Sequence, residues 1–299
     1  MARLWRLIIL ALSFLTHESM SGRAEAQKQV EPPIVFAVVR YSSYQCEPVC
    51  PQWILAEGQI TASSSAQLKK FIKANEKLKL PILIQSGGGD VRAALQMGRM
   101  IRKAGLDVVV GWTLLRDDCK PGMKTCKLPP EQNNVYSGFP FSGRAYCNSA
   151  CNLVLAGGVN RSASASVFVG AHQILTNWTK GDTIYYRDKY RIVNNKKQII
   201  SHKIVKRVKG KSYTTNGLYK GLRKELTAYL NEMGVGLGYF ELMDKAPPTS
   251  IYQVQEGDLK KIKLTTSQQG GEEFFNPQIC KGYPLVGYCI FRLPLSSKS

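Results

Sequence analysis

Histidine is scarce in this chain of 299 residues, and acidic side chains are few. There are three histidines, and 21 Asp and Glu are outnumbered by 41 Lys and Arg, which leaves a formal net charge of +20. The Cys-x3-Cys pairs resemble zinc-ligand spacing, but no Cys/His set with finger-like spacing follows, so we expect no metal site. The dinucleotide and P-loop glycine patterns are also missing. We therefore expect no cofactor, and any chemistry must come from side chains and backbone.

Long apolar runs are lacking as well. The longest near the N-terminus, residues 7–15, is too short to span a bilayer, and no later run approaches the roughly 18 residues that a membrane helix needs. Arg3 and Arg6 precede this run, and Ala24-Glu25-Ala26 follows it. That layout is typical of a secretory signal peptide over residues 1–26, although an uncleaved membrane anchor is the alternative. We expect a soluble mature protein, either periplasmic or secreted.

Eight cysteines are present, an even number, and they fall in four close pairs. In an oxidising compartment such spacing predicts local disulfides. The candidate bonds join Cys46 to Cys50, Cys119 to Cys126, and Cys280 to Cys289. Cys147 and Cys151 bracket Ser149, and a bond between them would be strained if both lay on one helical turn. Their pairing is left open.

Apolar runs alternate with amphipathic segments through the first two thirds of the chain. Predicted strands at 34–40, 53–60, 81–85, 106–112 and 167–174 are interleaved with predicted helices at 66–77, 91–104 and 149–156. Hydrophobic residues make up 44% of the chain, enough for a full core. This order predicts an α/β fold with a mainly parallel sheet. The main domain is expected at 27–265, with a surface insertion at 114–143 and a disulfide-stapled C-terminal tail at 266–299.

The segment 180–211 concentrates the positive charge. It contains eleven Lys or Arg against Asp182 and Asp188, and we predict a long helix over 182–209. Its charge is either an ordinary solvated face or a surface for an anionic envelope component or an acidic partner. Nucleic acid is not an expected partner of an exported protein.

Three features together suggest an acyl-transfer site. The turn Ser86-Gly87-Gly88-Gly89 lies between a strand and a helix, where backbone N–H groups can approach an anion, although a plain tight turn has the same composition. Ser149 starts an apolar helix, where a helix cap is the alternative. His172 ends an apolar strand and is the natural base, unless it is a core histidine. The Ala150 N–H would point to a developing oxyanion.

Three blocks carry a family resemblance: Ile-Gln-Ser-Gly-Gly-Gly-Asp-Val, Cys-Asn-Ser-Ala-Cys-Asn-Leu-Val-Leu-Ala-Gly-Gly and Ser-Val-Phe-Val-Gly-Ala-His-Gln. Over residues 34–264 the chain resembles the ClpP/crotonase superfamily, and within it exported, predicted periplasmic ClpP-like serine proteases. The resemblance implies a spiral of ββα units with a long handle helix that mediates oligomer contacts. It implies Ser149 as nucleophile, His172 as base, and the backbone of Gly89 and Ala150 as oxyanion donors.

The third catalytic residue departs from the family pattern. The ungapped position of the family's aspartate is Ser250, and the nearest carboxylate upstream is Asp244. Asp244 would need a shifted loop to reach the histidine, which leaves a Ser-His dyad, a water-bridged triad, or a site without activity. A Ser-Lys dyad is a further variant, although no obvious lysine stands out.

These observations favour an exported serine hydrolase, a peptidase that acts on polypeptide and assembles as a homo-oligomer. The alternative is a catalytically inactive binding or scaffold protein that uses the basic segment. A crotonase-like acyl-thioester enzyme would share the oxyanion geometry, but coenzyme A thioesters are not expected outside the cytoplasm.

Overall fold

A computed structural model describes residues 31–116, 121 and 134–291. The predicted signal peptide at 1–26 and much of the predicted insertion at 114–143 lie outside these described residues, as does the end of the predicted tail. Within the described ranges, no helix is both long enough and apolar enough to cross a bilayer.

A mixed sheet forms the core of the chain, in the order β5-β6-β1-β2-β3-β4-β8. Strands β1 and β2 are antiparallel, whereas β2, β3, β4 and β8 run parallel to one another. The parallel strands are rich in Val and Ile and almost wholly buried, as expected for a sheet that is covered on both faces. The strands are β1 (Val35–Tyr41), β2 (Val49–Glu57), β3 (Ile82–Gln85), β4 (Val108–Val110), β5 (Trp112–Leu115), β6 (Val135–Phe141) and β8 (Arg161–Ser162).

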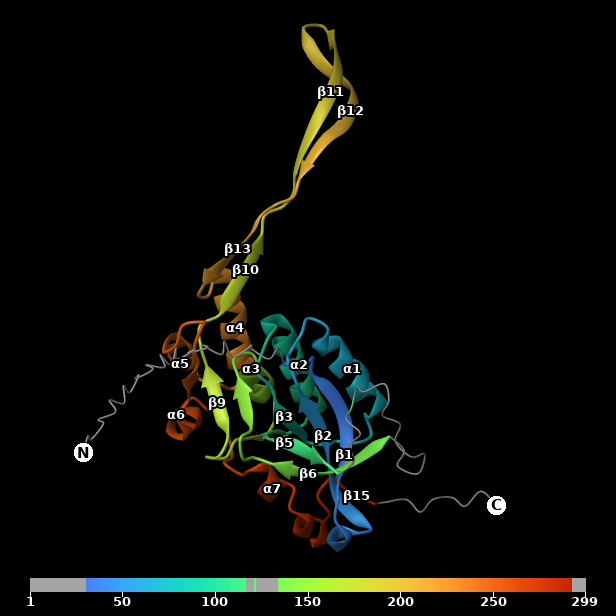
Figure 1. Cartoon of the computed structure of the whole chain (residues 1–299), viewed down its shortest axis with the longest axis vertical. Coiled ribbons are helices and arrows are strands. Elements are labelled where there is room, and N and C mark those ends of the chain that lie inside the picture. The colour runs from blue at the N-terminus through green and yellow to red at the C-terminus, as the bar shows by residue number, and fades with distance from the viewer. Residues whose placement is uncertain (1–30, 117–120, 122–133, 292–299) are drawn as a thin grey trace, which may run out of the picture. The chain divides into compact units, whose positions relative to one another are not determined.

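Three helices of the first half lie beside this sheet (Figure 1). They are α1 (Ser64–Ala74), α2 (Val91–Ala104) and α3 (Cys151–Ala156). Helix α2 begins where the Asp90 carboxylate accepts a hydrogen bond from the Ala93 N–H at 2.7 Å, and it ends at Gly105 with φ 69°. An N-terminal acidic cap and a left-handed terminal glycine are the local signals that bound a helix. The predicted α/β fold is confirmed.

A second, small sheet positions the candidate site. Strand β9 (Phe168–Ala171) pairs in parallel with β7 (Tyr146–Asn148) and antiparallel with β14 (Tyr252–Gln253). Ser149 directly follows β7, and His172 directly follows β9. Because the two strands are parallel neighbours, the residues after their carboxyl ends lie at the same edge of the sheet.

The remaining elements follow in the second half of the chain, apart from one short 3-10 helix between β1 and β2. Strand β10 pairs antiparallel with β13, and β15 pairs with β2. The elements are β10 (Leu175–Thr179), β13 (Ser212–Asn216), α4 (Lys220–Met233), α5 (Tyr239–Asp244), α6 (Glu256–Lys261), α7 (Gly271–Phe274) and β15 (Cys289–Phe291), with short 3-10 helices η1 (Tyr44–Cys46) and η3 (Pro277–Lys281).

The handle helix predicted within 180–211 is wrong. The segment forms a β-hairpin of β11 (Thr183–Val193) and β12 (Lys196–Val208), drawn in yellow and orange in Figure 1. Asn194 and Asn195 make the turn with φ of 50° and 59°. Two residues with positive φ suit a tight hairpin turn, and Tyr, Ile and Val favour strands. The many basic residues favoured the prediction of a solvated helix over this strand pattern.

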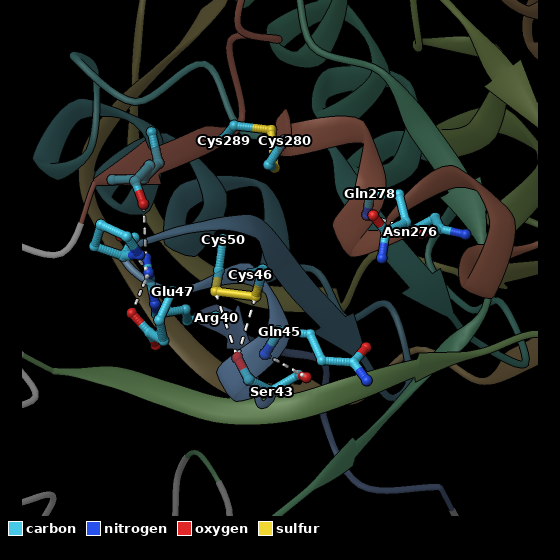
Figure 2. The surroundings of a disulfide bond; sticks show 12 residues. Arg40, Ser43, Gln45, Cys46, Glu47, Cys50, Asn276, Gln278, Cys280 and Cys289 are labelled. Carbon is cyan, nitrogen blue, oxygen red and sulfur yellow. Dashed lines mark hydrogen bonds and ion pairs between the residues drawn. A yellow bond between two sulfur atoms is a disulfide. The ribbon is translucent and has the colours of Figure 1, made fainter. Parts of the chain in front are cut away.

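Two of the three predicted disulfides are present in the described part of the chain. Figure 2 shows the bond between Cys46 and Cys50 and the bond between Cys280 and Cys289. The third predicted bond is not tested, because Cys119 and Cys126 both lie outside the described residues. The pairing of Cys119 with Cys126 therefore stays a prediction.

The pair whose bonding was left open is also a disulfide. Cys147 and Cys151 are bonded to each other, with a Cα–Cα distance of 5.2 Å. Cys147 belongs to β7 and Cys151 begins α3, so the two do not share a helical turn. The condition under which strain was expected therefore does not arise.

Candidate active site

Ser149 occupies a sharp turn between strand β7 and helix α3. Its φ is 55°, in the left-handed region that non-glycine residues rarely adopt. Its N–H donates to the Gly170 carbonyl at 2.8 Å, which ties the turn to β9. The N-cap residue of α3 is Ala150. Ser149 therefore does not cap the helix, which was the alternative role for it. Backbone strain of this kind is concentrated at functional sites.

The bridge between Cys147 and Cys151 closes this turn covalently. Both cysteines are fully buried, and Ser149 lies midway between them in the chain. On the other side, the Asn148 N–H donates to the Ser86 carbonyl at 2.9 Å, which joins β7 to the glycine turn. The serine turn is therefore held by backbone and disulfide contacts, and among the described residues the Ser149 hydroxyl has no hydrogen-bond partner.

His172 is oriented by a backbone carbonyl. Its Nδ1 lies 2.7 Å from the carbonyl oxygen of Gln173. Because a carbonyl can only accept a hydrogen bond, Nδ1 carries the proton, and Nε2 is the basic nitrogen of the neutral ring. The Gln173 N–H in turn donates to the Ala246 carbonyl at 2.9 Å, which fixes the segment after β9 against the loop after α5.

Ser149 and His172 line one small pocket together. Both side chains are half-buried, and Ala150 and Leu153 also belong to the lining. Apolar side chains complete the wall: Val91, Ile174, Leu226, Tyr239 and Met243. No hydrogen bond joins Ser149 to His172 within the described part of the chain. Catalytic hydrogen bonds are often loose in a free enzyme and tighten with substrate.

The proposed acids do not contact the histidine. Asp244 ends helix α5 with its side chain exposed, and Ser250 is also exposed. Among the residues that the structure describes, neither side chain has a hydrogen bond or ion pair with His172. The place where an acid would orient Nδ1 is taken by the Gln173 carbonyl. The described lining of the pocket also contains no lysine that could replace the histidine.

The glycine turn packs directly against the serine turn. Gly88 has φ 98°, and a Cβ added there would lie 2.6 Å from the Asn148 carbonyl oxygen and 2.8 Å from the Ser149 Cβ. Only glycine permits this approach. Gly89 has φ 132° and lines a neighbouring groove, which shares Val91 with the serine pocket. No acceptor for the N–H of Gly89 or of Ala150 is found among the described residues.

Sequence reasoning missed Glu31. One carboxylate oxygen accepts from the Gly87 N–H at 2.9 Å, and the other accepts from the Tyr146 hydroxyl at 3.0 Å. Glu31 thus joins the glycine turn to strand β7. Burial and the Glu31 carboxylate raise the pKa of Tyr146 to about 12. No local signal marked Glu31, because the contacts span more than fifty residues.

Sequence reasoning also missed Asn152, a polar residue inside the apolar helix α3. It is fully buried, and its side-chain NH2 donates to the Gly170 carbonyl at 2.8 Å and to the Tyr239 hydroxyl at 3.2 Å. Burial raises the pKa of Tyr239, which lines the serine pocket, to about 12. The signal that could have identified Asn152 is an amide among residues that are otherwise apolar.

No set of three His, Cys, Asp or Glu side chains in the described ranges could hold a metal ion. The serine pocket brings together the Ser149 hydroxyl, the His172 imidazole and Ala150, and Gly89 lines the groove beside it. Such a set can carry out acyl transfer without a cofactor.

No protein-family model matches this chain, and no curated protein matches it in sequence. It is similar to solved structures of the 1510-N membrane-bound stomatin-specific protease. A serine-to-alanine variant has 12% identity and a TM-score of 0.39, with 72% of this chain and 78% of that chain covered. A lysine-to-alanine variant in complex with a substrate peptide has 12% identity and a TM-score of 0.40, with 82% and 83% covered.

The chain is also similar to a variant of ClpP1 from Listeria monocytogenes, with 14% identity and a TM-score of 0.36. That match covers 71% of this chain and 88% of the other. The likeness is to the ClpP-like fold alone, at low identity, and it assigns no role to any residue of this chain.

Proposed function

We propose that this protein is a serine hydrolase, most simply a peptidase, with Ser149 as nucleophile and His172 as general base. One observation carries the proposal. The Ser149 hydroxyl sits on a left-handed turn, has no capping role, and lines the same pocket as an imidazole whose Nδ1 is already committed to the Gln173 carbonyl.

In the proposed reaction, Nε2 of His172 takes the hydroxyl proton as Ser149 Oγ attacks the scissile carbonyl carbon. The N–H groups of Ala150 and Gly89 stabilise the resulting oxyanion. Nε2 then gives its proton to the leaving amine as the carbon–nitrogen bond breaks, which leaves an acyl-enzyme. A water molecule activated by the same nitrogen hydrolyses the ester and restores both residues.

The histidine in this scheme is a member of a dyad. The Gln173 carbonyl holds the tautomer and the ring orientation, which is the positioning task of the acid in a triad. A neutral carbonyl stabilises an imidazolium less than a carboxylate does, so the proposed enzyme is slower than a full triad would be. Asp244 remains a candidate only if its loop shifts when substrate binds.

The surroundings favour an extended polypeptide that lies along the groove beside Ser149. The pocket beside Ser149 is lined by Leu153, Leu226 and Met243. A wider groove adjoins it, between the segment around Ile60 and Gly89 and strand β10. Strand β10 and the extended segment around Ile60 form part of its wall, which suits a chain bound as a strand.

A fluorophosphonate probe tests the proposal, because it phosphonylates an activated serine. The mature protein should be labelled, Ser149→Ala should not, and Ser166→Ala, at an exposed serine, should be labelled like the unchanged protein. Labelled-peptide mapping should return the segment that contains Ser149. Absence of labelling and of peptide turnover in the folded protein would reject the proposal.

An exported location and a homo-oligomeric state are part of the proposal. Three disulfides in the described ranges support an oxidising compartment. The second candidate function is a catalytically silent binding protein on the same fold, favoured by the lack of a described acid at His172 and by the exposed basic hairpin. Labelling of Ser149 separates the two functions, and light scattering of the purified protein measures the oligomer.

A further inference from the structure

The hairpin of β11 and β12 has two chemically different faces. Directly opposite residues of an antiparallel pair point to the same face, and neighbours along a strand point to opposite faces. Tyr186 is opposite Ile204 and Tyr190 is opposite Ile199, whereas Arg187 is opposite Lys203. One face, here the apolar face, carries Ile184, Tyr186, Tyr190, Ile192, Ile199 and Ile204. The other, the basic face, carries Arg187, Lys189, Arg191, Lys196, Lys203 and Lys206, with Tyr185, Val193 and Val208 toward its two ends.

The apolar face is uncovered in the described structure. Ile192 is 67% exposed, Ile199 58% and Ile204 49%. Within the described ranges, the two strands pair only with each other. An isolated two-stranded ribbon is marginally stable in water, and contiguous exposed apolar surface marks an interaction site. A partner for this face is therefore expected.

Two polar residues in the middle of the apolar face are paired with each other. Asp188 lies 2.5 Å from the His202 Nδ1, and the His202 ring stacks on Tyr186 with centroids 4.0 Å apart. One carboxylate oxygen and one ring nitrogen are therefore paired within the hairpin.

Two basic residues on the apolar face lie at its ends. Lys197 is opposite Ile192 next to the turn, and Arg207 is opposite Ile184 at the base. The Lys197 ammonium lies 4.6 Å from the Tyr190 ring centroid. The long apolar stems of Lys and Arg allow their charges to reach a polar layer while neighbouring side chains stay in an apolar one.

The net charge of the hairpin indicates which kind of partner could cover its apolar face. Residues 180–211 contain eleven Lys or Arg and two Asp, a net charge of +9. A second copy of the hairpin would bring two such charges together, which is unfavourable. An anionic surface with an apolar interior complements both faces at once, and tyrosine is well suited to the boundary between them.

We propose that this hairpin binds the surface of an anionic lipid bilayer. The apolar face lies at the boundary with the acyl chains, and the Lys and Arg side chains lie at the level of the headgroup phosphates, as in interfacial amphipathic helices. This goes beyond the proposed hydrolase activity and does not depend on it. It assigns a function to residues 180–211, which have no role in the proposed peptide hydrolysis.

Co-sedimentation of the mature Ser149→Ala protein with vesicles tests the proposal. Binding is expected to vesicles of phosphatidylcholine mixed with phosphatidylglycerol, and little to phosphatidylcholine alone. Reversal of three basic-face charges by Lys189→Glu, Arg191→Glu and Lys203→Glu should weaken binding about tenfold or more. Ile192→Ser, Ile199→Ser and Ile204→Ser should weaken it comparably, because the apolar contact is lost.

A matched control reverses three exposed charges on helix α1, with Lys69→Glu, Lys70→Glu and Lys73→Glu, and should leave vesicle binding nearly unchanged. Circular dichroism and an unchanged melting temperature show that each variant is folded. Equal binding to neutral and anionic vesicles would overturn the proposal. Binding that is weakened by the charge variants but not by the isoleucine variants would also overturn it. That result would indicate an anionic polymer or protein as the partner. Isoleucine variants that dissociate an oligomer yet bind vesicles normally would identify a second copy as the partner instead.

Discussion

Cys147 and Cys151 are bonded to each other across Ser149, so a covalent bridge closes the turn that presents the hydroxyl. The bridge joins the end of a strand to the start of a helix, and both cysteines are buried. The left-handed φ of Ser149 is therefore maintained by a covalently closed loop. We therefore predict that the proposed reactivity of the serine depends on an intact disulfide.

Removal of this bridge should affect the site more than the fold. The double variant Cys147→Ala with Cys151→Ala frees the turn to relax toward an ordinary φ, and a misplacement of about 1 Å can cost about 100-fold in rate. We expect fluorophosphonate labelling to slow by about that factor, measured by gel fluorescence over time. Cys280→Ser with Cys289→Ser is the matched control, since that bridge lies in the C-terminal segment. Equal slowing in both variants would mean a general loss of structure.

His172 should matter and Asp244 should not. General-base catalysis contributes about 100-fold to 10,000-fold, so His172→Ala should lower kcat/KM by that order. Asp244→Asn and Ser250→Ala should change it little, because neither side chain contacts the histidine in the described structure. Peptide turnover at several pH values is the measurement. A large loss in Asp244→Asn, with an altered pH profile, would show that the loop closes and supplies an acid.

Gly88 should tolerate no side chain. In Gly88→Ala the new methyl group would meet the Asn148 carbonyl oxygen and the Ser149 Cβ, in a backbone conformation with φ 98°. We expect a loss of stability of about 1–3 kcal/mol together with a loss of labelling. Gly257→Ala, in helix α6 with open space around it, should instead be neutral or stabilise by up to about 1 kcal/mol. Urea unfolding of both variants measures the difference.

Stability should decline steeply at alkaline pH. Burial raises the pKa of Tyr146, Tyr239 and Tyr288 to about 12, against an unfolded value near 10. A raised folded pKa means that the folded state holds the proton more tightly, so this stability is fully present below about pH 10 and is lost as pH rises toward about 12. Urea midpoints measured briefly at pH 9 and pH 11 should reveal the fall.

Tyr239→Phe should reduce this alkaline fall, because the variant has no hydroxyl proton to lose at that buried position. Tyr44→Phe, at a residue that is 87% exposed, should leave the fall unchanged. An identical slope in the Tyr239→Phe variant and the unchanged protein would contradict the assignment of the pH dependence to buried tyrosine.

Much of the framework could be predicted from local patterns. The strand around Val38, the helix after Asp90 with its terminal Gly105, and the short-range cysteine pairs that the structure describes depend on residues close in sequence. The positions of Ser149 and His172 at the ends of apolar runs are of the same kind. The structure brings those two side chains to one pocket, while their catalytic roles remain predictions until they are tested.

The hairpin was the main error, and it has a physical explanation. Eleven basic residues make a segment look like a solvated helix, yet Tyr186, Tyr190 and Ile192 recur with the period of a strand, and Asn194-Asn195 can adopt two positive φ values. On the second strand the period of two is interrupted, because the register shifts leave Ile200 and Val205 as extra residues. Pairing between strands, which the sequence does not display, overrode the charge pattern.

The sequence by itself determined which segments are buried, where the glycine and serine turns fall, and which cysteines are near enough to bond. Tertiary structure alone decided what surrounds the catalytic candidates. The bond from the Gln173 N–H to the Ala246 carbonyl, the Glu31 carboxylate at Gly87, and the closeness of Gly88 to Ser149 all join residues far apart in the sequence. Local propensity acts over a few residues, whereas these contacts exist only after distant strands have paired.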